Sequence, residues 1–75
     1  MDKKFEEVIN QVNPEILENK DVDLLDEGII DSLQIMILVS SLCEAYSIDI
    51  DPDDITPEAF CTVESIWNLV KKYME

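Results

Sequence analysis

The sequence predicts a small all-α fold with three principal helices, a short third helical turn and a long loop between the first and second helices. Apolar residues recur at helical spacing in three separate segments. The one alternating stretch, SIDIDI, contains aspartates that suit a loop better than a strand. The length of 75 residues fits one domain over residues 1–75. Such a core can hold a fold together but leaves little room for a deep substrate pocket.

The first helix is expected over residues 3–12. Its apolar residues follow the i, i+3, i+4, i+7 spacing of one helical face: Phe5, Val8, Ile9 and Val12. Asp2 can cap its start, and Pro14 should end it because proline cannot continue an interior hydrogen-bond ladder. Asn13, Pro14 and Glu15 then indicate the cap and first positions of a short helical turn that buries Ile16 or Leu17.

A long acidic loop is expected over residues 19–31, NKDVDLLDEGIID. It holds five acids, one lysine and the only glycine of the chain. Leu24, Leu25 and Ile29 should anchor this loop against the core. Long loops of this kind are uncommon in small domains and are often functional.

The second principal helix should begin at Ser32, with Asp31 as its cap, and run to about Tyr46, where Ser47 ends it. One stripe belongs to the core: Ile35, Leu38, Val39, Leu42 and Tyr46. A second apolar set lies outside this stripe, near the amino end of the helix: Leu33, Met36 and Ile37. Tight packing of all three inside the protein is the alternative. A chain this short cannot cover both sides of a central helix, so we expect an exposed docking surface.

The carboxyl-terminal part begins with a second acidic loop, SIDIDPDDI. An EF-hand loop starting at Asp49 would need glycine and glutamate where the chain has Asp54 and Phe60, so no metal site is expected. Thr56 should cap a short turn that has Pro57 at its first position, followed by Glu58, and that points Phe60 inward. Thr62 should cap the last helix, whose apolar face holds Val63, Ile66, Trp67, Val70 and Tyr73.

Composition argues against an independent enzyme. The chain has no histidine, and its five basic residues are all lysines. The usual general base for a serine or cysteine nucleophile is therefore missing, as is the arginine fork that grips phosphates and base edges. The net charge of −13 should repel nucleic acids and anionic membrane surfaces and attract basic protein surfaces.

Cys43 and Cys61 show no CxxC spacing, so we expect two reduced thiols rather than a disulfide or a metal pair. The amino terminus has no apolar run of signal-peptide length, and no segment is long and apolar enough to span a membrane. A cytoplasmic monomer is expected.

Ser32 is the most interesting candidate for chemistry. Serine is common at helix starts, and a structural role alone would explain it. A serine or Cys43 nucleophile in an enzyme is the second alternative, which the missing base disfavours. The third is modification by another protein, since the hydroxyl should face outward at a helix amino end, where an added phosphate is favoured. The neighbouring apolar set would give the modifying enzyme a surface to bind.

The chain resembles the acyl and peptidyl carrier proteins, also called phosphopantetheine-binding domains. The resemblance covers nearly the whole chain, through the motifs GIIDSL, ITPEAF and TVESIWNLV. It implies a four-helix bundle in which Ser32, flanked by Asp31, receives 4'-phosphopantetheine from coenzyme A through a phosphopantetheinyl transferase. The arm would carry acyl or aminoacyl thioesters between ligases or synthases of fatty-acid, polyketide, nonribosomal-peptide or D-alanylation pathways. The alternative is an acidic helical adaptor that is never modified.

One departure from the fatty-acid carriers concerns the helix after Ser32. Between Ser32 and Tyr46 the only acid is Glu44, and the other acids gather in the two loops. We therefore expect partners to contact this helix mainly through Leu33, Met36 and Ile37 while the loops steer them electrostatically. This pattern is similar to stand-alone carriers that work with adenylate-forming ligases, including the D-alanyl carrier type.

Overall fold

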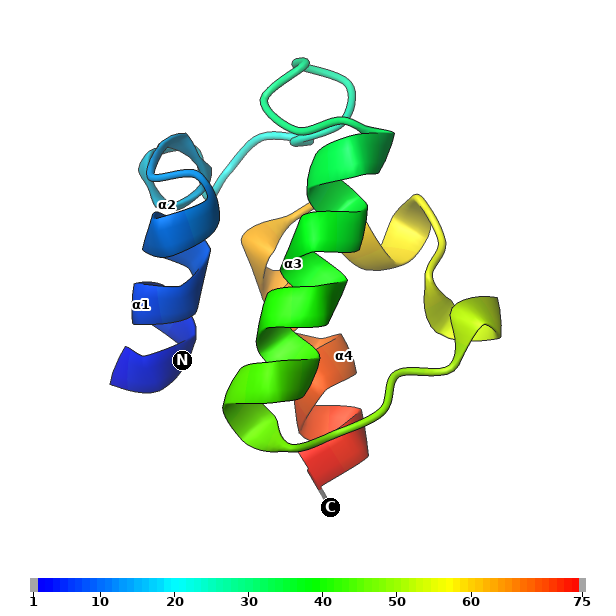
Figure 1. The fold of residues 1–75 in the computed structure, drawn as a ribbon. Coiled ribbons are helices and arrows are strands. Elements are labelled where there is room, and N and C mark those ends of the chain that lie inside the picture. The colour runs from blue at the N-terminus through cyan, green and yellow to red at the C-terminus, as the bar shows by residue number, and fades with distance from the viewer. Residues whose placement is uncertain (1, 75) are drawn as a thin grey trace.

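The computed structural model describes residues 2–74 as an all-α fold, which confirms the predicted fold class (Figure 1). The α-helices are α1 (Lys3–Val12), α2 (Glu15–Glu18), α3 (Ser32–Tyr46) and α4 (Val63–Met74). Two single 3₁₀ turns, η1 (Pro52–Asp54) and η2 (Glu58–Phe60), lie between α3 and α4. The predicted third helical turn is thus η2, and it is 3₁₀ rather than α-helical. None of the described helices is long and apolar enough to cross a membrane.

The helix starts follow the capping residues that the sequence indicates. Oδ1 of Asp2 accepts a hydrogen bond from the Phe5 amide at 2.8 Å. Oγ1 of Thr62 accepts one from the Ser65 amide at 3.0 Å, and Oγ1 of Thr56 accepts one from the Ala59 amide at 3.2 Å. Each bond satisfies an amide of the first turn that has no partner within the helix. These local bonds explain why the element starts are readable from the sequence.

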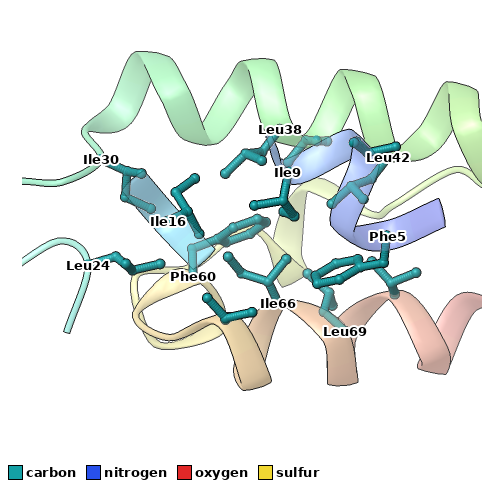
Figure 2. Packing of buried hydrophobic residues seen from close by; sticks show 14 of the residues in the cluster. Phe5, Ile9, Ile16, Leu24, Ile30, Leu38, Leu42, Phe60, Ile66 and Leu69 are labelled. Atoms are coloured by element: carbon teal, nitrogen blue, oxygen red, sulfur yellow. The ribbon is translucent and has the colours of Figure 1, made fainter. Parts of the chain in front are cut away.

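The core lies between α1, α3 and α4, with side chains from the loops closing one end (Figure 2). Phe5, Ile9, Leu38, Phe60 and Ile66 are completely buried. Burial of a large apolar side chain contributes about 1.5–3 kcal/mol, so this layer is the main source of stability.

The buried set differs in detail from the predicted one. Ile35 and Tyr46 of α3, placed in the core by the helical spacing, are only half-buried. Leu69 of α4 is buried although it lies beside the predicted stripe. Ile30 is also buried, and it ties the end of the long loop to the core next to Leu24 (Figure 2).

Candidate functional site

Ser32 is the first residue of α3 and is exposed to solvent. Asp31 precedes it in an extended conformation and caps the helix, because its Oδ1 accepts a hydrogen bond from the Gln34 amide at 2.9 Å. The Asp31 carbonyl accepts the bond from the Ile35 amide at 3.0 Å. Ser32 therefore lies at the capped start of α3, where the long loop joins this helix (Figure 1).

The loop before Ser32 is held by backbone hydrogen bonds to Leu24. The Leu24 carbonyl accepts from the amides of Ile29 at 2.9 Å and Ile30 at 3.2 Å. The Leu24 amide donates to the carbonyl of Cys61 at 2.6 Å, which ties the loop to the end of η2. Gly28 turns the chain with a φ of +72°, a conformation that costs other residues about 1 kcal/mol. The acidic loop is thus anchored, as its apolar residues predicted.

Asn13 connects the end of α1 to this loop and to α3. Its Nδ2 donates to the Ile29 carbonyl and to Oε1 of Gln34, each at 3.0 Å. Its Oδ1 accepts from the Glu15 amide at 3.0 Å, which is the capping bond that the sequence predicts. The contacts with Ile29 and Gln34 were not predicted, because residues 16 and 21 positions away give no local signal.

Three exposed apolar side chains follow Ser32 along α3. The exposed fractions of Leu33, Met36 and Ile37 are 69%, 57% and 45%. The expected exposure of this apolar face is therefore observed. Large apolar groups exposed side by side favour contact with another molecule.

An open hollow lies beside Ser32. Its volume is about 240 Å³, and its other walls are Ile35, Met36, Ile55, Thr56 and Pro57. The first three residues of the ITPEAF segment thus face the start of α3, although Ser32 and Ile55 lie 23 positions apart in the sequence. This hollow was not predicted, since a contact between a loop and a helix leaves no periodic pattern in the sequence.

Charge around the site is negative, and few acids are neutralised within the chain. Among residues 2–74 the one ion pair joins Nζ of Lys72 to Oδ2 of Asp54 at 3.2 Å, at the carboxyl end of α4. In the same described range no group of three or more acidic or cysteine side chains is arranged to hold a metal ion. Cys43 and Cys61 are free and half-buried. The acids therefore give the described part of the protein a negative electrostatic field.

A family model described as the phosphopantetheine attachment site matches residues 3–68. The chain belongs to this family. It is therefore a phosphopantetheine-carrying carrier protein, and its cofactor is covalently attached 4'-phosphopantetheine. Carrier domains of the family interact with phosphopantetheinyl transferases and biosynthetic enzymes and are generally not catalytic themselves. Comparisons with curated proteins and with solved structures give no significant match to this carrier.

The residues around Ser32 fit the group that the family carries. A phosphate ester requires an accessible hydroxyl, and Ser32 is exposed. The first amides of a helix favour a phosphate next to them, although the Asp31 carboxylate opposes this effect. The adjoining hollow between Met36 and Pro57 leaves room for an attached chain at the surface.

Proposed function

We propose that Ser32 is the residue of this carrier that bears 4'-phosphopantetheine, and that residues 1–75 act as one acyl or aminoacyl carrier domain. The observation that supports this most strongly is the exposed hydroxyl at the capped start of α3, immediately before an exposed apolar face. When attached, the group supplies a thiol on a flexible arm, which holds acyl or aminoacyl groups as thioesters. The position of the arm on a rigid helix gives it a high effective concentration at a partner's active site.

The attachment step uses Ser32 as the nucleophile. Its Oγ forms a bond to the pantetheine-bearing phosphorus of coenzyme A, and the bond from that phosphorus to the bridging oxygen breaks. The adenosine bisphosphate portion of coenzyme A leaves, and the serine proton passes to a base. The chain has no histidine and no arginine, and we expect the transferase to supply the base and the groups that stabilise the phosphate charge. We propose that this carrier is the acceptor in this step and catalyses none of these bond changes itself.

We propose that Leu33, Met36 and Ile37 form the partner-docking face, with Asp31 as the flanking cap. The acids that surround this face belong to the two loops, and only Glu44 lies on α3. Electrostatic steering by the loops and apolar contact at the helix suit a stand-alone carrier that an adenylate-forming ligase loads, with the D-alanyl carrier type as one candidate. Fatty-acid, polyketide and nonribosomal-peptide synthases are the other candidate partners. The free thiols of Cys43 and Cys61 agree with the reducing environment of the cytoplasm, and we propose that the carrier is a cytoplasmic monomer.

Intact mass spectrometry tests the attachment residue. Incubation with coenzyme A and a broad-specificity phosphopantetheinyl transferase should add about 340 Da to the wild-type protein. Ser32→Ala should remove this gain, and Ser40→Ala, which changes another exposed serine of α3, should retain it. A protein that stays unmodified, or a Ser32→Ala variant that still gains the mass, would contradict the proposal. The first of these results would favour the unmodified adaptor.

The docking face is tested by transferase and ligase kinetics at several salt concentrations. Met36→Ala and Ile37→Ala should each raise KM several-fold, because they remove exposed apolar contact area. Ser40→Ala is again the matched control. If a fatty-acid malonyl transferase loads the protein efficiently, with strong salt dependence and no response to either variant, apolar docking is wrong.

A further inference from the structure

We infer that Asn13 is a positioning residue for the attachment turn: it holds the chain on both sides of Ser32 and so fixes the direction in which the hydroxyl points. This inference rests on the proposal that Ser32 bears the phosphopantetheine. Asn13 does not touch the reacting atoms, and it acts through Ile29 before the serine and Gln34 after it.

The hydrogen bonds of the Asn13 side chain leave no ambiguity in its orientation. Its Oδ1 faces the Glu15 amide, which can only donate, and its Nδ2 faces the Ile29 carbonyl, which can only accept. The amide group therefore cannot turn by 180° without losing both bonds. Its second Nδ2 hydrogen then meets Oε1 of Gln34. Both Nδ2 hydrogens and the Oδ1 atom of the side chain therefore have a partner.

The backbone of Asn13 is equally fixed. Its amide donates to the Ile9 carbonyl at 2.9 Å, and its carbonyl accepts from the Ile16 amide at 3.1 Å. The residue is half-buried at the junction of α1 and α2. Because both helices anchor it through the buried side chains of Ile9 and Ile16, it gives the turn a rigid support.

Gln34 extends this support to the residue directly before the serine. Its side chain accepts from Asn13, and its backbone amide donates to Oδ1 of Asp31 at 2.9 Å. A chain of hydrogen bonds therefore runs from Asn13 through Gln34 to Asp31, and Ser32 lies between its last two members.

A partner enzyme binds the serine well only while the turn holds the competent conformation. If a fraction of the molecules leaves that conformation, the apparent affinity falls by the same fraction, whereas the rate at saturation does not change. Loss of the Asn13 donors should therefore raise KM of the transferase for the unmodified protein and leave kcat unaltered.

Asn13→Asp is the sharpest variant, because it keeps the acceptor for Glu15 and the side-chain volume but removes both donors. Gln34 can turn its side-chain amide so that its NH2 group donates to the new carboxylate. The Ile29 carbonyl can only accept, so its hydrogen bond to residue 13 is lost. Asn19→Asp is the matched control: it adds the same charge nearby and removes one donor, whose bond to the Glu15 carbonyl lies away from Ser32. Gln34→Glu keeps an acceptor for Asn13, and Gln34→Ala does not.

The test compares these variants by amide hydrogen exchange and by transferase kinetics, well below their melting temperatures. In Asn13→Asp, the fraction of molecules with the competent turn should fall to about a tenth, so KM should rise about tenfold at constant kcat, and exchange at Ile29, Ile30, Gln34 and Ile35 should rise by at least the same factor. Asn19→Asp and Gln34→Glu should stay within about twofold of the wild type. If Asn13→Asp fails to fold, the comparison of Gln34→Ala with Gln34→Glu replaces it.

Unchanged exchange at the turn, or an unchanged KM despite faster exchange, would overturn the inference. A fall in melting temperature alone would assign Asn13 to general stability and would also overturn it. Failure of the proposed function gives a different result, since the wild-type protein would then gain no mass at Ser32. In that case amide exchange would still report whether Asn13 holds the turn. Failure of the proposed function and failure of the Asn13 inference are therefore distinguishable.

Discussion

Both tyrosines of the chain donate their hydroxyl hydrogen bonds to aspartates, and each bond joins distant segments. Tyr46, at the end of α3, donates to Oδ1 of Asp2 at 2.7 Å. Tyr73, in the last turn of α4, donates to Asp54 of η1 and accepts from the Asp51 amide at 3.1 Å. Burial, followed by the bond to Asp2, raises the pKa of Tyr46, and the bond to Asp54 raises the pKa of Tyr73. These contacts join the end of α3 to the start of α1 and the end of α4 to η1.

An alkaline titration should show that both tyrosines ionise late. Because folding raises each pKa, the bonds stabilise the protein fully below pH 10 and lose this effect as the pH rises through the raised values. Tyrosinate absorbance in the folded wild type should therefore have its midpoint above 10. The single variants Tyr46→Phe and Tyr73→Phe assign the two groups. A tyrosine that titrates at its ordinary value in the folded protein would contradict the hydrogen bond to its aspartate.

Ser47 offers a stabilising substitution. It ends α3 with a φ of 55°, a left-handed conformation that favours glycine. Ser47→Gly should gain about 0.5 kcal/mol, since the relief of about 1 kcal/mol of strain exceeds the added entropy of the unfolded chain. Ser40→Gly, inside the same helix, should instead lose about 0.5 kcal/mol. Urea unfolding measures both. A change of the same sign in the two variants would show that the end of α3 is not strained.

At the scale of elements, the starts of the helices were predictable and the contacts between them were not. Each capping side chain accepts a hydrogen bond from an amide only three residues away, so its role can be predicted from the adjacent residues in the sequence. The four caps are Asp2, Asp31, Thr56 and Thr62. The contacts of Asn13 and the hollow beside Ser32 join residues 16 to 23 positions apart, and no local rule predicts them.

The burial of α3 illustrates the same limit. Helical spacing separated its core residues Leu38, Val39 and Leu42 from its exposed residues Leu33, Met36 and Ile37. Spacing did not predict that Ile35 and Tyr46, on the core stripe, would stay half-buried. Ile35 lines the hollow instead, and Tyr46 reaches the amino end of α1. The degree of burial at the ends of a helix depends on which loops cover it.

The Asp31 cap should contribute to stability through its hydrogen bond rather than its charge. Asp31→Ala removes the acceptor for the Gln34 amide and should cost about 1 kcal/mol. Asp31→Asn keeps an acceptor of the same geometry and should cost only a few tenths of that amount. Chemical unfolding of both variants checks the difference. Equal losses would mean that the negative charge next to the helix start, not the capping bond, stabilises α3.

At the scale of the whole molecule, charge repulsion opposes folding. The chain has 18 acids against five lysines. Its one ion pair within residues 2–74, Lys72 with Asp54, is exposed on the lysine side and therefore contributes little. The same excess of acids would steer basic partners toward the proposed docking face of Leu33, Met36 and Ile37. On this proposal, repulsion in the isolated protein and fast association with partners are two effects of one charge distribution.

Salt and pH should reveal this repulsion together. At pH 7.5, an increase from low to physiological salt should raise the melting temperature by roughly 5 °C, because screening weakens the repulsion among the acids. Near the pI of about 4.1 the net charge vanishes, so the salt dependence should nearly disappear.

The pKa of Asp2 is lowered by its bonds from Tyr46 and the Phe5 amide, and that of Asp54 by its bonds from Tyr73 and Lys72. Both carboxylates therefore stabilise the fold above pH 3.8 and lose this effect as the pH falls through their lowered values.

Stability should thus rise as the pH is lowered from 7.5 toward the pI and fall again only below 3.8. Thermal unfolding at dilute protein concentration, followed by circular dichroism, measures the rise in stability toward the pI and the fall below pH 3.8, which is called the acidic limb below. Tyr46→Phe and Tyr73→Phe should flatten the acidic limb and leave the salt dependence at pH 7.5 unchanged, since they remove the aspartate bonds without altering net charge. The same salt dependence at pH 7.5 and near the pI would mean that repulsion among the acids does not limit the stability of this carrier.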